Sequence, residues 1–232
     1  MKTLMFSLLI LLLVNGCSKD DPVTPETPTM PTAGLILHYP LNGDGTEASG
    51  HATNGTVHNT APMVNRHSKA ASACSFNGNA YIEVPAAASL PTGNQPRTIS
   101  AWFKTTVMAN QVIVEWGTHA QGQRCGMLVC DLLGGVADFS GYINDFRGTK
   151  QVINNAWHHY VFTYDGTVGR IYLNGVLDAE STVVLNTQGT LFSIGRRANG
   201  NQTLEYFQGA IDDVRVYNRV LSMAEIQLLA SE

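Results

Sequence analysis

Hydrophobic and polar residues alternate with a period of two along most of the chain. The clearest run is Trp157–Asp165, in which aromatic and β-branched residues occupy both faces. A period of two is the geometry of a β-strand, and apolar groups on both faces predict a strand that is covered on both sides. A polar turn, Gly166–Gly169, and a second alternating run, Arg170–Asn174, complete a hairpin. This hairpin predicts a layered β-protein.

Other apolar or alternating runs, bounded by Gly, Asn and Pro, recur at intervals of roughly 8–12 residues, a spacing typical of β-sandwiches. The predicted strands are Leu35–Leu41, Ala73–Phe76, Tyr81–Val84, Thr98–Lys104, Gln111–Trp116, Gly126–Leu132, Val136–Ile143, Ser181–Leu185, Leu191–Gly195 and Gln208–Tyr217.

Only the C-terminal end has a helical pattern. Ser222-Met223-Ala224-Glu225 has the S-x-x-E order of a capping box and precedes the apolar residues Ile226, Leu228 and Leu229. One short helix after many strands predicts an all-β fold, an antiparallel two-sheet β-sandwich with a short C-terminal helix.

The chain begins with an unbroken apolar run, Leu4–Val14, in which only Ser7 is polar. A membrane span needs roughly 20 apolar residues, so this run is typical of the apolar region of a signal peptide. It ends in Val14-Asn15-Gly16-Cys17, which resembles a bacterial lipobox. That resemblance implies cleavage before Cys17 and lipidation of its sulfur, and several acyl chains together anchor a protein stably. The alternative is a plain secretory signal with an incidental cysteine.

The segment after the cysteine predicts where the protein is displayed. Ser18-Lys19-Asp20-Asp21 resembles the export signal of surface lipoproteins in Bacteroidetes-type bacteria. The stretch Asp21–Thr32 alternates proline with threonine and acid, which predicts an extended, semi-rigid tether. We therefore expect a lipoprotein signal peptide over 1–16, a lipidated tether over 17–33 and one domain over 34–232, held at the outer membrane and facing the cell exterior.

Charge excludes one class of partner. The chain has 14 Lys+Arg and 18 Asp+Glu, a formal net charge of −4, and its longest basic run is Arg196-Arg197. Nucleic-acid binding depends on clustered positive charge, so nucleic acid is not expected as a partner. Contact with a membrane is expected only through the N-terminal lipid.

Three cysteines remain besides Cys17. An odd number allows at most one internal disulfide. Cys125 and Cys130 are five residues apart, which places them on opposite faces of a straight strand, so only a bulge or turn would pair them. Cys74 shares its face with Phe76 and is expected to be a small core residue. We predict three free thiols.

Motifs across Gly34–Glu232 together resemble one known family. They are Tyr39-x-Leu41 with Glu47-Ala48-Ser49-Gly50, Phe76-Asn77-Gly78 with Tyr81-Ile82, Thr98–Phe103, Trp157–Gly166, Tyr172-x-Asn174-Gly175, Ile194-Gly195 and Phe207–Ser222. This combination resembles the laminin-G-like jelly rolls with the concanavalin A-like fold. The resemblance implies the fold and leaves the function open, because this fold is found in lectins, adhesins, protein-interaction modules and enzymes.

Oxygen-rich residues near the two ends of this domain predict a calcium site. The loop Asn42–Gly55 supplies Asp44 and Glu47, and the last strand supplies Asp212 and Asp213. Calcium prefers carboxylate and carbonyl oxygens, and in related jelly rolls the chain ends lie side by side. The family often has an aspartate where this chain has Glu47. The alternative is that Asp44 forms a turn and that Asp212 pairs with Arg215 or a loop amide.

The carboxylates give little sign of a glycosidase. Enzymes of the resembled family commonly present two carboxylates on one strand face, as in Glu-x-Asp-x-x-Glu, so that both reach one bond. No glutamate of the domain is followed by an acidic residue two positions later. Asp212 and Asp213 are adjacent on a strand and are expected to face opposite ways. We therefore expect no catalytic residues.

Sugar binding uses exposed aromatic faces beside planar polar groups. Such residues gather in the middle of the chain, while the family match favours packing roles for Trp102 and Trp157. Trp116 ends a strand before a polar loop, so both core and site roles stay open for it. The predicted ligand-binding residues are Trp116, His119, Arg124, Tyr142, Asn144, Asp145 and Arg147.

These observations predict a non-catalytic, carbohydrate-binding surface lipoprotein whose partner is a glycan or a host or bacterial surface polysaccharide. The alternatives are an adhesion or protein-interaction module and, further off, a glycoside hydrolase of concanavalin A-like fold.

Overall fold

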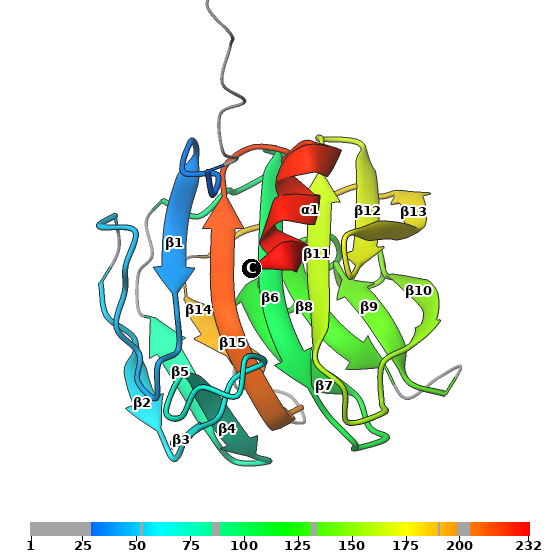
Figure 1. Ribbon diagram of the computed structural model, residues 1–232. Helices are drawn as coiled ribbons and strands as arrows, with labels where there is room; N and C mark the ends of the chain where they lie inside the picture. Colours follow the sequence, from blue (N-terminus) through cyan, green and yellow to red (C-terminus); the bar gives the residue numbers. More distant parts are fainter. Residues whose placement is uncertain (1–28, 52, 85–88, 131–133, 190, 199–204) are drawn as a thin grey trace, which may run out of the picture.

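Two antiparallel sheets, packed face to face, form the protein (Figure 1). The computed structural model describes residues 29–51, 53–84, 89–130, 134–189, 191–198 and 205–232, which form strands β1 to β15 and one helix, α1. The predicted signal peptide, Cys17 and most of the tether lie outside the described residues. The all-β sandwich with a short C-terminal helix is confirmed.

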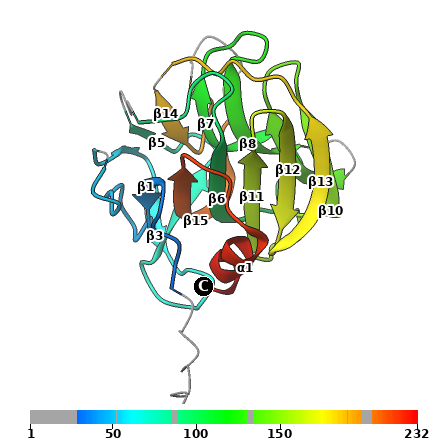
Figure 2. The ribbon, with the colours of Figure 1, turned by 90° about the horizontal axis from the view of Figure 1, so that it is seen from above.

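The first sheet has eight strands, and its outer face carries α1 (Figure 2). Its strands are, in spatial order, β13 (Val176–Thr182), β12 (Val168–Leu173), β11 (His158–Tyr164), β6 (Arg97–Lys104), β15 (Gln208–Tyr217), β4 (Ala73–Asn77) and β3 (Ala61–Met63), with β1 (Leu35–Tyr39) also paired to β15. All of β11 is buried, as its two apolar faces predicted.

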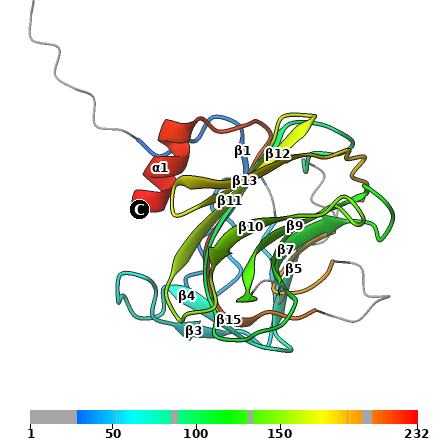
Figure 3. The same cartoon turned by 90° about the vertical axis from the view of Figure 1, so that its right-hand side faces the viewer.

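The second sheet has seven strands and lies on the side of the sandwich away from α1 (Figure 3). Its strands are, in spatial order, β10 (Phe146–Gln151), β9 (Val136–Ser140), β8 (Arg124–Cys130), β7 (Gln111–Gly117), β14 (Phe192–Ile194), β5 (Tyr81–Val84) and β2 (Thr56–His58). The predicted strands Gly126–Leu132 and Val136–Ile143 correspond to the antiparallel pair β8 and β9.

Three strands, β2, β3 and β10, were not predicted, and β13 begins at Val176, before the predicted Ser181. In β10, FRGTKQ, only Gly148 is buried, and β2 and β3 are short and mostly exposed. Strands at or near a sheet edge bury too little apolar surface to show a hydrophobic alternation.

The core between the sheets is aromatic. The rings of Phe139 and Phe162 stack across the two sheets with their centroids 3.8 Å apart. Trp116 has no exposed surface, and its indole Nε1 donates to the carbonyl of Pro91 at 3.2 Å. The tryptophans for which packing was expected, Trp102 and Trp157, are only half-buried and lie outside this core. Trp116 is therefore the tryptophan that packs between the sheets.

A second, smaller core lies between α1 and the outer face of the eight-stranded sheet. It consists of Val161, Tyr172, Tyr217, Leu221, Ile226 and Leu229. Met30 packs against this cluster, and the Tyr217 hydroxyl donates to the carbonyl of Pro31 at 3.1 Å. The folded unit thus includes the last residues of the predicted tether. No helix within the described ranges has the length and hydropathy needed to cross a membrane.

The thiols of Cys74, Cys125 and Cys130 are free, as predicted. Cys74 and Cys125 lie in the core. Cys130 is on the opposite face of β8 from Cys125, as their odd spacing requires.

The predicted capping box at the start of α1 leads to a stability prediction. The Ser222 side chain accepts from the backbone N–H of Glu225, and the Glu225 carboxylate accepts from the backbone N–H of Ser222 at 2.8 Å. Replacing Ser222 with alanine leaves a helix donor without a partner, so Ser222→Ala should lower the free energy of unfolding by about 0.5–2 kcal/mol in urea denaturation. Met223→Ala, an exposed neighbour in the same helix, is the control. Equal effects of the two substitutions would contradict a role for the cap.

Candidate functional site

The outward face of the seven-stranded sheet carries charged side chains that contact one another, whereas polar side chains on an outer sheet face usually contact only water. Successive residues of a strand point to opposite faces. On β8 the residues Cys125, Met127 and Val129 enter the core, so Arg124 and Cys130 lie on the outward face. The same alternation on β9 sends Phe139 inward and Asp138 and Ser140 outward.

These outward residues line a hollow of about 200 Å³, here called the sheet pocket. Its lining is mostly polar, with three arginines and three carboxylates. The lining residues are Asn110, Arg124, Leu128, Cys130, Asp138, Ser140, Asp145, Arg147, Arg197 and Glu205.

Ion pairs and hydrogen bonds connect the polar groups of the sheet pocket. The carboxylate of Glu115, on the adjacent β7, accepts from Arg197 at 2.8 Å and lies 3.6 Å from Arg124. Arg124 donates to the Ser140 hydroxyl at 2.7 Å, and that hydroxyl donates to Asp145 at 3.0 Å. The network holds the guanidinium of Arg124 in one orientation.

Some buried polar atoms on this face lack a hydrogen-bond partner within the described residues. In the sheet pocket they are Asp138 Oδ1 and Arg124 Nε, whose ion-pair contacts are both long, 3.6 Å. Farther along the same sheet they are Ser193 Oγ and Arg196 Nε. Buried polar atoms in folded proteins are nearly always bonded to protein or to water. Ordered water or a bound ligand is expected to complete the hydrogen bonds of these atoms.

Asp138 is the most perturbed group in the sheet pocket. Burial raises the pKa of its carboxyl to about 7; the Arg147 guanidinium opposes this shift and the Asp145 carboxylate adds to it. Near neutral pH this carboxyl therefore exists in both forms. It can donate a hydrogen bond when protonated and accept one when ionised.

Aromatic rings lie beside the sheet pocket. The rings of His119 and Tyr142 are 4.0 Å apart between centroids, and the Arg124 guanidinium lies 5.2 Å from the Tyr142 ring. Tyr142 and Ile143 both have left-handed backbone angles, φ 57° and 73°, which turn the chain after β9. Desolvation and the positive charges of Arg124 and Arg197 lower the pKa of His119, so its imidazole is neutral at pH 7.

The structure brings together most of the residues that the sequence selected for ligand binding. Arg124, Asp145 and Arg147 line the sheet pocket, and His119 and Tyr142 lie next to it. The amide of Asn144 donates to the carbonyl of Val184 at 2.6 Å, so Asn144 holds the neighbouring loop in place.

Trp116 is the exception. Its ring lies in the core with no exposed surface, so the expectation that it stacks on a ligand is wrong for this structure. Trp116 shares the inward face of β7 with Val114, and Glu115 between them faces outward. The register of β7 shifts between Val112 and Val114, so that Ile113 also enters the core. A bulge of this kind changes which residues face the core, and the alternation of the sequence alone does not show where it falls.

Sequence reasoning missed Asp138, Ser140, Arg197 and Glu205. A signal existed for the first two, because they are the polar positions of the alternating run Val136–Ile143. Arg197 and Glu205 come from a distant part of the chain and are brought to β7 and β8 only by sheet pairing.

The carboxylates predicted to bind calcium are engaged with protein groups. Glu47 accepts hydrogen bonds from the backbone N–H groups of His38, Ser49 and Gly50, each at 2.9 Å. Asp44 accepts from the backbone N–H of Thr46 at 2.9 Å, which is the turn-forming alternative. These oxygens hold the first loop in shape.

Asp212 and Asp213 do not diverge as expected. Arg66 bridges them, 2.6 Å from Asp212 and 2.8 Å from Asp213, because a bulge in β15 with Asp213 at φ 48° brings both carboxylates to one side. Burial works against ionisation of Asp213, but His38, Arg215 and Arg66 lower its pKa to about 2. A cation here would meet two guanidinium groups, and the described residues contain no group of three or more His, Cys, Asp or Glu placed to hold a metal. Calcium binding stays a prediction, which melting temperatures with and without a chelator test.

Comparison with known proteins shows which fold the domain has. The sequence profile of the family described as "Concanavalin A-like lectin/glucanases superfamily" matches residues 76–227. No curated protein sequence matches the chain.

Several solved structures share the architecture. Domain 4 of AbnA, a GH43 extracellular arabinanase from Geobacillus stearothermophilus in complex with arabinotriose, superposes with a TM-score of 0.68 at 21% identity over 85% of this chain and 98% of that one. The binding domain of Paraclostridial Mosquitocidal Protein 1 superposes with a TM-score of 0.65 at 17% identity, over 85% of this chain and 52% of that one. A mutant Trypanosoma rangeli sialidase superposes with a TM-score of 0.62 at 18% identity, over 88% of this chain and 33% of that one.

The buried carboxyl of Asp138 predicts a pH dependence of stability. Its pKa is higher in the folded chain than the ordinary value of 3.8, so the folded chain binds more protons than the unfolded one between 3.8 and about 7. Stability from this group therefore falls as pH rises through that interval. Asp138→Asn cannot ionise, so its free energy of unfolding relative to the wild type should rise with pH, by up to about 1.4 kcal/mol for each unit of pKa shift.

Asp165→Asn is the matched control, because hydrogen bonds from the backbone N–H of Val168 and neighbouring groups lower the pKa of Asp165. Its substitution should change the pH dependence in the opposite direction. The Asp165 effect falls below pH 3.8 and the Asp138 effect between 3.8 and about 7, so urea denaturation of the three proteins from below pH 3.8 up to about 7 measures both. Parallel pH curves for Asp138→Asn and the wild type would contradict the raised pKa.

Proposed function

The chain belongs to the concanavalin A-like lectin/glucanases superfamily, and from this premise we propose that it is a non-catalytic carbohydrate-binding module whose ligand occupies the sheet pocket. One observation carries the proposal. Asp138 Oδ1 and Arg124 Nε are buried at this pocket without hydrogen-bond partners among the described residues, although unbonded polar atoms in folded proteins are costly.

The chemistry of the lining supports a sugar. Guanidinium and carboxylate groups are planar and form paired hydrogen bonds, which suit neighbouring hydroxyls on a sugar ring. The half-buried Tyr142 ring, with the His119 ring tilted by 52° against it, provides an aromatic face for sugar C–H groups beside these charges. Arginines and carboxylates are equal in number among the lining residues, which favours a neutral glycan over a strongly charged one.

The solved structures give the proposal a further, weaker support. AbnA domain 4 was solved with arabinotriose, and its whole length is close to that of the domain described here. Other structures of this shape are toxin receptor-binding domains and parts of sialidases. At these sequence identities the likeness concerns the fold, so the identity of the glycan has to come from experiment.

Display at the cell surface is part of the proposal. It rests on the resemblance of Val14–Cys17 to a lipobox and on the acidic residues after Cys17. A lipidated protein of this kind would carry the sandwich on its proline-rich tether and present the sheet pocket to extracellular polysaccharide.

Replacing Cys17 with serine should release the protein from membranes in cell fractionation if Cys17 carries the anchor.

A glycoside hydrolase is the second candidate, because Asp138 has a raised pKa and shares the pocket with Asp145 and Glu205. A proton-donating carboxyl near a second carboxylate is what glycoside cleavage requires. Incubating any bound glycan with the wild-type protein separates the two functions. Shortened products that disappear with Asp138→Asn would contradict the non-catalytic proposal.

A glycan array with the purified protein tests the lead proposal. We expect binding to a limited set of neutral glycans, and we expect Arg147→Ala to weaken it about tenfold or more, because a hydrogen bond to a charged group is worth about 1.5–3 kcal/mol. Arg147 is partly exposed, so its loss should leave the fold intact.

Arg170→Ala is the matched control. Arg170 is a similarly exposed arginine on β12 of the other sheet, where it pairs with Asp165 and Glu180. The Arg170→Ala variant should bind glycan as the wild type does. Absence of binding to every glycan, or equal loss in both variants, would overturn the assignment of the ligand to the sheet pocket.

A further inference from the structure

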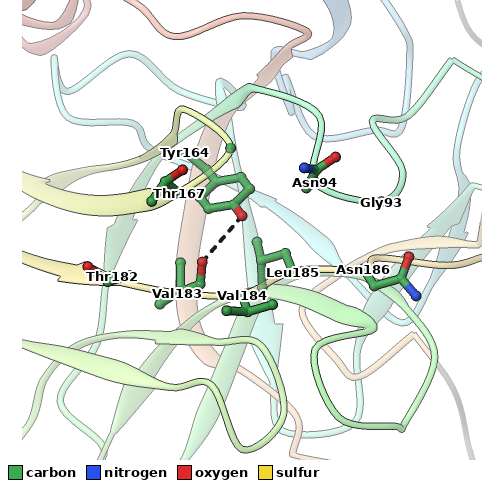
Figure 4. A pocket seen from close by; sticks show the side chains of 10 residues that line it. Gly93, Asn94, Tyr164, Thr167, Thr182, Val183, Val184, Leu185 and Asn186 are labelled. Carbon is green, nitrogen blue, oxygen red and sulfur yellow. Dashed lines mark hydrogen bonds between the residues drawn. The ribbon is translucent and has the colours of Figure 1, made fainter.

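A second hollow lies at the end of the sandwich where β11 ends and where β12 and β6 begin (Figure 4). It measures about 390 Å³ and is here called the end pocket. Loop residues before β6, the β11–β12 turn and the segment after β13 surround it. The lining residues are Gly93, Asn94, Tyr164, Gly166, Thr167, Thr182, Val183, Val184, Leu185 and Asn186.

Backbone hydrogen bonds join the segments that form the end pocket. Gly93 and Thr187 exchange two of them, at 2.8 and 3.1 Å. The N–H of Val183 donates to the carbonyl of Thr167 at 3.0 Å, and the N–H of Asn186 donates to the carbonyl of Gly122 at 2.7 Å. The walls are therefore fixed relative to one another before any ligand arrives, which lowers the entropic cost of binding.

A buried arginine strengthens this arrangement. Arg97 has no exposed surface and donates to the Thr187 hydroxyl at 2.8 Å and to the carbonyls of Gly93 and Gln95, each at 2.9 Å. Its guanidinium lies 5.6 Å from the Tyr164 ring centroid. A buried cation needs such groups around it, so the loop before β6 and the segment after β13 are held in place by Arg97.

The polar groups of the end pocket are uncharged and available. Asn94, Thr167, Thr182 and Asn186 are exposed, and within the described part of the chain their side chains form no hydrogen bond. The Tyr164 hydroxyl, by contrast, donates to the carbonyl of Val183 at 3.3 Å, as the dashed line in Figure 4 shows. Two amides and two hydroxyls are thus free to bind a ligand.

The remaining lining is apolar. Tyr164, Val183 and Leu185 are almost fully buried, and Val184 is 73% exposed. Val184 therefore offers apolar surface to C–H groups, while the amides and hydroxyls beside it accept and donate hydrogen bonds. None of the described residues that line the pocket is charged, so neither an anion nor a cation finds an opposite charge in its lining.

From this lining we infer that the end pocket is a second ligand site and that it binds one uncharged, hydroxyl-rich ring, a neutral sugar residue. Its volume lies within the range of small-ligand pockets. The site is separate from the sheet pocket and does not depend on the function proposed for it, because the two share no lining residue.

Amide chemical shifts test the inference with the full chain. The probes are the methyl glycosides of glucose, galactose, mannose and arabinose, each titrated at millimolar concentration into the ¹⁵N-labelled protein. We expect at least one of them to shift the amide resonances of Gly93, Gly166, Val184 and Asn186. Thr182→Trp should abolish these shifts, since Thr182 is exposed on β13 and a bulky aromatic ring there fills the pocket without entering the core.

Smaller substitutions refine the test. Asn94→Ala and Asn186→Ala should each weaken the shifting glycoside roughly threefold to tenfold, as expected for one lost hydrogen bond. Asn79→Ala, at an exposed asparagine in the turn between β4 and β5, should have no effect. Unchanged amide spectra elsewhere in each variant show that the fold is intact.

Two results would overturn the inference. One is that none of the four glycosides shifts the end-pocket amides, or that they do so equally in Thr182→Trp. The other is that N-methylacetamide, a mimic of the peptide group, shifts these amides while the glycosides do not, which would make the site a peptide site. Shifts at Ser140 and Asp145 report on the sheet pocket in the same spectra, so failure of one site is distinguishable from failure of the other.

Discussion

The packing of the two sheets on one aromatic core is the constraint on which the rest of the structure depends. Phe139 from β9 and Phe162 from β11 stack across the sheets, and Trp116 from β7 packs in the same core, where its ring lies 6.1 Å from that of Phe192. Once these side chains point inward, the strict alternation of a strand sends Asp138 and Glu115 outward. The polar pocket on the seven-stranded sheet is thus a direct consequence of how the core is filled.

The charges on that outward face are better explained by binding than by stability. Buried ion pairs gain little over apolar packing, because desolvation of the two charges offsets their attraction. Even so, Glu115 holds two arginines here, and two polar atoms in the same pocket have no hydrogen-bond partner among the residues that the structure describes. A ligand that brings several hydroxyls would complete their hydrogen bonds.

The end pocket follows a different physical logic. Its polar groups are neutral and exposed, and the charge that shapes it, Arg97, lies behind its wall and donates to backbone carbonyls. The two hollows therefore differ in chemistry as well as in place. In the account proposed above, uncharged polyols would be recognised on two distinct surfaces of a small sandwich, one on a sheet face and one among loops.

Much of this architecture could be predicted from the pattern of residues. Period-two alternation and the S-x-x-E sequence predicted most strands, the sandwich and the capped helix, because local geometry decides them. The region from Trp116 to Arg147 was also predicted as the ligand-binding region, because aromatic and planar polar residues gather there, and ligand binding stays a prediction. Three structural features could not be predicted from the sequence. The bulge in β7 turned Ile113 into the core beside Val114, the bulge in β15 brought Asp212 and Asp213 to Arg66, and long-range pairing brought Arg197 and Glu205 to the pocket. Bulges and distant pairings depend on the whole fold, so no local pattern shows them.

A crystal structure of the protein with a glycan that it binds tests the central claim most directly. The account predicts sugar density over β8 and β9, with ring hydroxyls within hydrogen-bond distance of Asp138 Oδ1 and Arg124 Nε. Density that leaves both atoms without a partner, with the glycan bound elsewhere on the molecule, would contradict it.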